Sequence, residues 1–206
     1  TTVWVLVIST GGTIASAIYR EEGVKPVHKT STEVIDLLLK EISKRDPWIR
    51  EVDVDVRELF KPIDSTDMRP EYWSHMANEI FKLIDNYDGI IITHGTDTMA
   101  YTASALTFML LGLPRPIVLT GSMKPALQLS SNGNVIVNPS SDALSNFNLA
   151  LRAIPLLERI PGVYVAFHGK IMLGCRVSKT RLTIDAFESI NYPLVAKFDD
   201  VSKELR

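Results

Sequence analysis

Three short stretches of the sequence combine hydroxyl side chains with glycine directly after an apolar run: residues 9–13 (STGGT), 93–98 (THGTDT) and 120–123 (TGSM). A serine or threonine hydroxyl attacks a carbonyl only when a nearby base takes its proton, so a nucleophile here needs a partner. Asp97 supplies a carboxylate within the second stretch, and a lysine removed from solvent could serve as the base. Lys124 and Lys179 are both candidates by position, and their spacing does not choose between them.

The glycine pair Gly11-Gly12 admits three interpretations. A phosphate cradle would require G-x-G-x-x-G or G-x-x-x-x-G-K-[ST], and neither pattern occurs in the sequence. A plain turn that needs positive φ, with Thr13 capping the next segment, is the simplest interpretation of the pair taken alone. The third interpretation is that the pair is the backbone that aims Thr13 as a nucleophile.

Other kinds of catalytic site find little support. None of the four histidines stands in an H-E-x-x-H or Cys-His ligand spacing, so we expect no metal site. His94 ends an apolar strand, where a packed, hydrogen-bonded histidine is more common than a general base. The single cysteine, Cys175, excludes an internal disulfide and favours a reducing compartment. It has no visible activating partner, and we expect it to be a small buried residue.

The elements that must position these groups alternate along the chain. Apolar runs of strand length recur at 3–9, 52–59, 89–94, 116–121 and 162–169. Helical patterns occupy 30–45, 69–87 and 97–112, the first opening with a Thr30–Glu33 capping box and the last ending at Gly112. This alternation predicts an α/β fold with a doubly wound, mainly parallel, flavodoxin-like sheet. The carboxyl ends of its strands would bring the three stretches to one edge.

Composition limits the class of protein and of partner. Across 206 residues, 46% are hydrophobic and 22% charged, which is typical of a globular domain. The formal net charge of -2 and the scattered basic residues give no reason to expect a nucleic-acid partner. The apolar start is too short for a membrane span or a typical signal peptide. Residues 123–146 are expected to form a long connection, and residues 191–206 to begin a linker.

Five motifs occur in a fixed order: STGGTIAS, HGTDTMAYTASAL, LTGSMKP, GKIMLGCRVSKTR and FESINYP. Together they resemble the amino-terminal domain of the L-asparaginase family, nearest to its archaeal-type members, over almost the whole chain. The resemblance implies cofactor-free hydrolysis of L-asparagine to L-aspartate and ammonia through an acyl-enzyme on a threonine. It implies a catalytic domain at 1–190 and, beyond the linker that begins at 191, a smaller carboxyl-terminal domain. The segment 123–146 is longer than the equivalent loop of the family.

The resemblance also implies the roles of particular residues. The implied catalytic residues are Thr13 as nucleophile, then Thr96, Asp97 and Lys179, and a lid tyrosine. This choice of Lys179 leaves Lys124 as a structural residue. Where archaeal-type sequences carry the lid tyrosine this chain has Val24, so Tyr19, five residues earlier, is the candidate for that role.

The implied substrate-binding residues come from four places in the chain: Gly12, Asp64, Ser65, Thr66, Gly95 and Ser122. Ser65 would contact the α-carboxylate of the substrate. Asp97, besides its catalytic role, would contact the α-amino group, and the carbonyl of Ser122 would accept from the nitrogen of the side-chain amide.

The family's active sites lie between subunits, so the resemblance implies a homodimer or higher oligomer. It also implies a small-molecule substrate, L-asparagine. The single cysteine favours a cytoplasmic protein, and the charge and the short apolar start predict neither a nucleic-acid nor a membrane partner. Two alternatives stay open. One is the asparaginase-like component of glutamyl-tRNA(Gln) amidotransferase, which releases ammonia from glutamine. The other is a non-catalytic amino-acid-binding domain, which the departure at Val24 favours.

Overall fold

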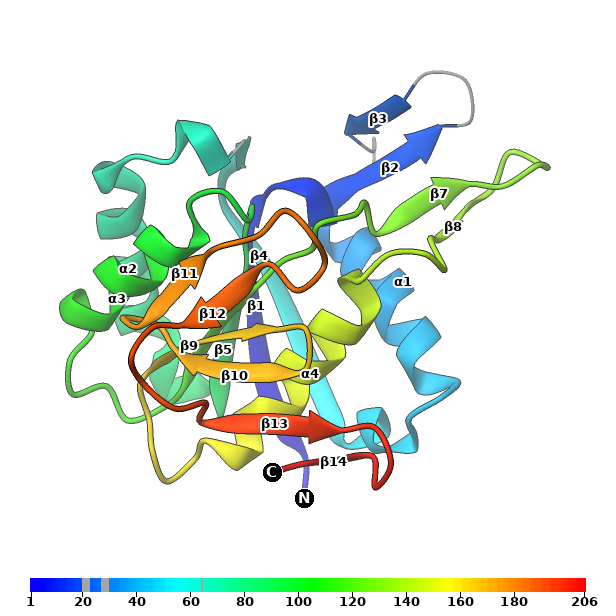
Figure 1. The fold of residues 1–206 in the computed structure, drawn as a ribbon. Helices are drawn as coiled ribbons and strands as arrows, with labels where there is room; N and C mark the ends of the chain where they lie inside the picture. Colours follow the sequence, from blue (N-terminus) through cyan, green and yellow to red (C-terminus); the bar gives the residue numbers. More distant parts are fainter. Residues whose placement is uncertain (20–22, 27–29, 64) are drawn as a thin grey trace.

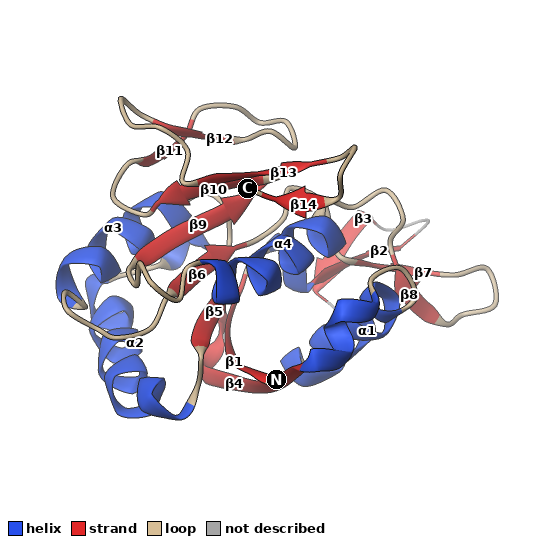
Figure 2. Cartoon of the chain, turned by 90° about the horizontal axis from the view of Figure 1, so that it is seen from below, coloured by secondary structure: helices blue, strands red, loops and turns tan. Residues whose placement is uncertain are grey.

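The computed structural model of the protein describes residues 1–19, 23–26, 30–63 and 65–206, with side chains described outside 16–29 and 62–65. A central sheet has helices against both faces (Figures 1 and 2). Its parallel strands are β1 (Val3–Gly11), β4 (Val52–Ile63), β5 (Gly89–Thr93), β6 (Ile117–Thr120) and β9 (Val163–Phe167). Their spatial order, β4-β1-β5-β6-β9, is the flavodoxin-like order. The predicted fold class is therefore confirmed.

Two pairs of helices cover the sheet. They are α1 (Ser31–Ser43) with α4 (Ala143–Leu156), and α2 (Pro70–Leu83) with α3 (Met99–Met109). Successive residues of β1 serve both faces: Val5 and Val7 join the core under α1 and α4, whereas Leu6 and Ile8 join the core under α2 and α3. Because both faces are buried, the strands are continuous apolar runs in the sequence.

The predicted end signals of two helices can be compared with the structure. The Thr30–Glu33 capping box is present at the start of α1, with both reciprocal hydrogen bonds formed. Gly112 has φ +81 and lies two residues beyond Leu110, the C-cap of α3, so the left-handed glycine comes one position later than the predicted C′.

The segment 123–146 is not the long irregular connection that the sequence predicted. It contains β7 (Leu127–Leu129) and β8 (Val135–Val137), which form a hairpin closed by Ser130 N–H donating to Asn134 O at 2.7 Å. This hairpin belongs to a separate sheet with β2 (Ser16–Tyr19) and β3 (Gly23–Pro26), in the order β3-β2-β7-β8 (Figure 1). The segment ends in the first turn of α4, a helix that the sequence patterns missed.

The carboxyl-terminal part of the chain adds antiparallel strands to the central sheet. β10 (Lys170–Leu173) pairs with β9, and β13 (Ala196–Asp199) pairs with β10 and with β14 (Glu204–Leu205). Residues 196–199 and 204–205, which we expected to belong to a linker, are thus part of the sheet. The position at which a linker to a second domain begins remains a prediction.

Candidate active site

The carboxyl ends of β1, β5 and β6 bring the three hydroxyl- and glycine-rich stretches to one edge of the sheet. Ser9 pairs with Thr93, and Thr93 pairs with Thr120. The order of the strands reverses at β1, because β4 lies on one side of it and β5 on the other. Ligands of open α/β sheets bind outside the carboxyl ends of the strands at such a switch point. This edge is therefore the candidate site.

Gly12 brings the loop after β1 into backbone contact with the loop after β5. It has φ +85, and a Cβ built on it would lie 2.4 Å from the Cα of Gly95. Gly121 approaches the same loop, since a Cβ there would lie 2.2 Å from the carbonyl oxygen of His94. Gly12 thus supplies both a left-handed φ and a close approach, which is more than a plain turn requires.

Thr13 follows this contact directly and opens the short 3₁₀ turn Thr13–Ala15. The turn is closed by Ala15 N–H donating to the Gly12 carbonyl at 3.1 Å, and the side chain of Ile14 anchors it in the core. Thr13 itself is half-buried. The glycine pair therefore fixes the backbone from which a partly accessible threonine projects at the sheet edge.

Thr96, Asp97 and Lys179 are brought together although Lys179 comes from a distant hairpin. The Lys179 Nζ donates to Thr96 Oγ1 at 2.8 Å and to Asp97 Oδ1 at 2.9 Å. Lys179 ends β11 (Val177–Lys179), which pairs with β12 (Phe187–Ser189). Thr96 is buried, whereas the Asp97 side chain is 58% exposed. The structure thus places Lys179 at Thr96, and Lys124 is an exposed residue of the loop after β6.

His94 supports the loop after β5 from inside the protein. Its Nδ1 lies 2.7 Å from the Gly95 carbonyl, its Nε2 lies 2.9 Å from the Thr102 hydroxyl, and that hydroxyl accepts from Trp73 Nε1 at 2.8 Å. Burial lowers the pKa of His94 to about 4, against a smaller opposing effect of the Gly95 hydrogen bond. The ring is therefore neutral, and the network assigns its proton to Nδ1. As predicted, His94 is a packed and hydrogen-bonded histidine.

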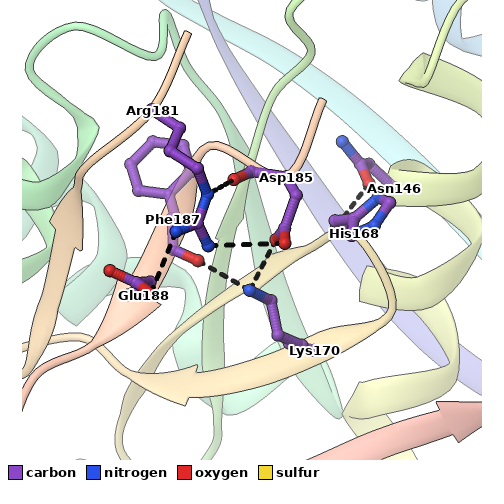
Figure 3. A network of polar contacts seen from close by, with 7 residues as sticks. All are labelled: Asn146, His168, Lys170, Arg181, Asp185, Phe187 and Glu188. Atoms are coloured by element: carbon purple, nitrogen blue, oxygen red, sulfur yellow. Dashed lines mark hydrogen bonds and ion pairs between the residues drawn. The ribbon is translucent and has the colours of Figure 1, made fainter. Parts of the chain in front are cut away.

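The loop after β6, which contains Ser122, is held by two side chains around the start of α4. Both carboxylate oxygens of Asp142 accept from Met123 N–H, at 3.1 and 3.0 Å. Asn146 donates to the Gly121 carbonyl at 2.9 Å and accepts from His168 N–H at 2.9 Å (Figure 3). Asn146 therefore ties the loop after β6 to the loop after β9. The sequence patterns missed both residues, because they missed the helix α4, which has Asp142 as its N-cap and contains Asn146.

Several predicted site residues stay untested by this geometry. The structure describes the backbone but not the side chains of Tyr19, Val24 and Ser65. Asp64 lies outside the described residues. Thr66 is exposed in the short 3₁₀ turn Ser65–Asp67. The roles that the resemblance implied for these residues remain predictions.

The prediction that Cys175 is a small buried residue is wrong, because Cys175 is exposed. It lies in the turn between β10 and β11, where the chain leaves the core. Across residues 1–19, 23–26, 30–63 and 65–206, no cluster of three or more His, Cys, Asp or Glu side chains is arranged to hold a metal ion. Within the same described ranges, every helix is too short or too polar to span a bilayer.

Comparison with known proteins identifies related chains over almost the full length. Residues 4–206 match the family described as Asparaginase, N-terminal. An L-asparaginase from Thermococcus kodakarensis is 44% identical over 199 residues, which cover 95% of this chain and 54% of that protein. A component of the glutamyl-tRNA(Gln) amidotransferase of Archaeoglobus fulgidus is 36% identical over 204 residues, covering 95% of this chain and 44% of that protein.

A solved structure agrees in fold. The thermostable L-asparaginase from Thermococcus kodakarensis matches with a TM-score of 0.77 and 41% identity, covering 98% of this chain and 55% of that one. The chain therefore spans about half the length of the relatives that it matches.

Proposed function

This chain belongs to the asparaginase amino-terminal domain family, and we propose that it is the catalytic domain of an L-asparaginase, hydrolysing L-asparagine to L-aspartate and ammonia. The observation that supports this proposal most strongly is the lysine at Thr96. One ammonium donates to Thr96 Oγ1 at 2.8 Å and to Asp97 Oδ1 at 2.9 Å, in the loop that Gly12 contacts. A hydroxyl next to a lysine and a carboxylate is an arrangement suited to moving a proton during acyl transfer.

The proposed reaction has two steps. The Thr13 hydroxyl attacks the side-chain amide carbon of asparagine, ammonia leaves with the proton that the hydroxyl gives up, and an ester remains on Thr13. Water then cleaves the ester, which yields aspartate and restores the threonine. Backbone N–H groups of the glycine-lined loops stabilise the negative charge that develops on the carbonyl oxygen. Asp97 orients Lys179, which takes part in moving the proton through Thr96, and Tyr19 is the candidate for the role of the lid tyrosine.

The remaining predicted residues bind the substrate in this proposal. Ser65 holds the α-carboxylate, its neighbours Asp64 and Thr66 line the same part of the binding site, and Asp97 holds the α-amino group. Gly95 and Ser122 line the position of the side-chain amide. The reaction needs no cofactor.

We infer that the active assembly contains more than this chain. Since the chain spans about half of its L-asparaginase relative, a second, carboxyl-terminal domain is proposed to complete the site. A homodimer or higher oligomer would then bring that domain to the catalytic loops. A cytoplasmic location follows the single cysteine of the sequence.

The test is ammonia release from L-asparagine by this chain, alone and mixed with the carboxyl-terminal half of the Thermococcus kodakarensis relative. We expect activity in the mixture and little with the chain alone. Thr13→Ala in the same mixture is the negative control. Absence of ammonia in both preparations would contradict the proposed activity, and asparagine binding without turnover would then favour the binding-domain alternative.

A second candidate function has its own support in the 36% identity with a component of a glutamyl-tRNA(Gln) amidotransferase. That function predicts ammonia release from glutamine at least equal to release from asparagine. It also predicts that charged tRNA and the partner protein stimulate the release. A strong preference for asparagine that does not respond to tRNA would exclude it.

A further inference from the structure

The hairpin β11–β12 carries Lys179 but does not belong to the central sheet. Its two strands form a separate two-stranded sheet, in which Lys179 pairs with Phe187. An isolated two-stranded hairpin is marginally stable in water. The position of the Lys179 amine must therefore be set by contacts between this hairpin and the rest of the protein.

Lys170 makes such a contact at the residue directly opposite Lys179. Its Nζ donates to the Phe187 carbonyl at 2.7 Å and to Asp185 Oδ1 at 2.7 Å (Figure 3). The Lys170 side chain is only 14% exposed, and it projects from β10 of the central sheet. One ammonium thus ties the central sheet both to the backbone of β12 and to the loop that joins β11 to β12.

A second, apolar contact holds the β11–β12 hairpin at the same residue, Phe187. The ring of Phe187 is fully buried and meets the ring of Phe167 edge-on, with centroids 4.8 Å apart. The Phe187 side chain therefore fixes the hairpin to β9, while its carbonyl is fixed to β10 through Lys170. Apolar packing alone permits small sliding movements, whereas a charge-assisted hydrogen bond to a backbone carbonyl is directional.

The outer contacts of this network are weaker. Arg181 donates from Nε to the Asp185 carbonyl at 2.9 Å and from Nη1 to Glu188 at 3.1 Å. The Arg181 and Glu188 side chains are both about two-fifths exposed, and exposed ion pairs contribute little. The hydrogen bond from Lys170 is also the first cause of a lowered pKa at Asp185, so Lys170 stabilises the ionised form of this carboxylate. Lys170 is therefore the central group of the network.

We propose that Lys170 is a positioning residue for catalysis, which holds the β11–β12 hairpin so that the amine of Lys179 reaches Thr96. The role in catalysis rests on the proposed function, because it assumes that Lys179 handles a proton. The positioning itself is a structural statement and can be measured without turnover.

The first experiment compares Lys170→Met with Lys170→Arg in the active mixture. Lys170→Met keeps the length of the side chain but removes both hydrogen bonds. We expect kcat to fall by about tenfold to a hundredfold, because small displacements of catalytic groups have effects of this size. KM should stay within about threefold, since the described contacts of Lys170 are with Asp185 and Phe187, which are outside the proposed substrate-binding set. Lys170→Arg retains donors and should recover part of kcat.

Lys82→Met is the matched control. Lys82 also forms an ion pair, with Glu79 at 3.3 Å, but this pair is exposed on α2. The substitution Lys82→Met should leave kcat and the melting temperature unchanged.

The second experiment measures the acetylation rate of the Lys179 amine by acetic anhydride as a function of pH, using mass spectrometry on the folded chain. In the wild type the Lys179 side chain is 14% exposed and its amine is hydrogen-bonded to Thr96 and Asp97, so the amine should react slowly. Lys170→Met should accelerate its acetylation severalfold while acetylation of Lys82 in the same sample stays constant.

The outcomes separate the two proposals. If the wild-type mixture releases no ammonia, the proposed function fails, and the acetylation of Lys179 still decides the positioning role. If Lys170→Met leaves both kcat and the acetylation rate unchanged, the inference is wrong. A loss of melting temperature with unchanged kcat and unchanged acetylation of the folded fraction also overturns it, because Lys170 would then serve stability alone.

Discussion

The Lys179 ammonium donates a hydrogen bond to the Thr96 hydroxyl at 2.8 Å, across 83 residues of sequence. The Lys179 side chain is 14% exposed and that of its other acceptor, Asp97, is 58% exposed. Water reaches the Asp97 carboxylate and screens the Lys179–Asp97 ion pair, so this ion pair contributes little to stability. We therefore attribute the arrangement to orientation of the amine rather than to support of the fold.

Replacing Lys179 should remove activity without unfolding the protein. In Lys179→Met the amine is lost, and ammonia release in the active mixture should fall by about a hundredfold to ten-thousandfold, the usual contribution of a general acid or base. Thermal unfolding followed by circular dichroism should change little. Lys124→Met is the control, because Lys124 was the other lysine that the sequence allowed. A larger loss of activity in Lys124→Met than in Lys179→Met would reverse the assignment.

Gly12 should tolerate no side chain. In Gly12→Ala the new Cβ would lie 2.4 Å from Gly95 Cα and 2.5 Å from Gly95 N, and the residue would keep φ near +85. Left-handed strain and overpacking together should lower the free energy of unfolding by at least about 2 kcal/mol, measured by urea denaturation. Gly133→Ala is a matched control, since Gly133 has φ +83 and nothing lies within 4 Å of its added Cβ. Equal losses in the two variants would mean that the Gly12–Gly95 contact is unimportant.

His94 should make the protein less stable as the pH falls from about 6.5 to about 4. Burial lowers its folded pKa to about 4 from the ordinary 6.5. In this range the unfolded chain binds the proton and the folded chain does not, so acid favours unfolding. The difference corresponds to roughly 3 kcal/mol from this ring, complete once the pH reaches about 4.

The measurement is urea unfolding at several pH values between 4 and 7, with His94→Gln and His75→Gln compared. The pH dependence should be shallower in His94→Gln than in His75→Gln, in which an exposed histidine is replaced. A direct NMR titration of the His94 ring should give a pKa near 4. An ordinary value near 6.5 would show that the ring is accessible to protons.

The sequence predicted the central part of the fold because that part is built from regular, fully apolar strands. Val5 to Ile8 are buried on alternating faces, so β1 is a continuous apolar run that is easily recognised. The helix α4 was missed because its buried face includes Asn146, and because Pro155 lies inside it. A polar residue that is buried by its tertiary hydrogen bonds has no local signature in the sequence.

The candidate site was predictable only in part for the same reason. Three strand ends meeting at one edge follow from a parallel sheet, so the approach of Thr13 to the Thr96 loop could be anticipated. The choice of Lys179 required a resemblance, since its position depends on the packing of a separate hairpin. Lys170 gave no signal at all, because a buried lysine and an exposed one are identical in a sequence.

Thr13 should be required for turnover and dispensable for folding. It is half-buried at the start of a short turn, and its replacement by valine removes the hydroxyl while keeping the shape. If the hydroxyl is the nucleophile, Thr13→Val should abolish ammonia release, and Thr13→Ser should retain a measurable part of it. The free energy of unfolding should stay within about 0.5 kcal/mol of the wild-type value, as for other lightly packed positions.

Thr10→Val is the opposite case, three residues earlier on β1. The Thr10 hydroxyl is buried and donates to the Thr93 carbonyl at 2.7 Å. Loss of this hydroxyl leaves a buried carbonyl without that donor and should lower the free energy of unfolding by about 1 to 3 kcal/mol, while the folded fraction keeps its activity.

The Thr13 prediction would be contradicted by ammonia release at the wild-type rate in Thr13→Val, because another group would then attack the amide. In that case, burst-phase trapping in the wild type would detect no ester on Thr13.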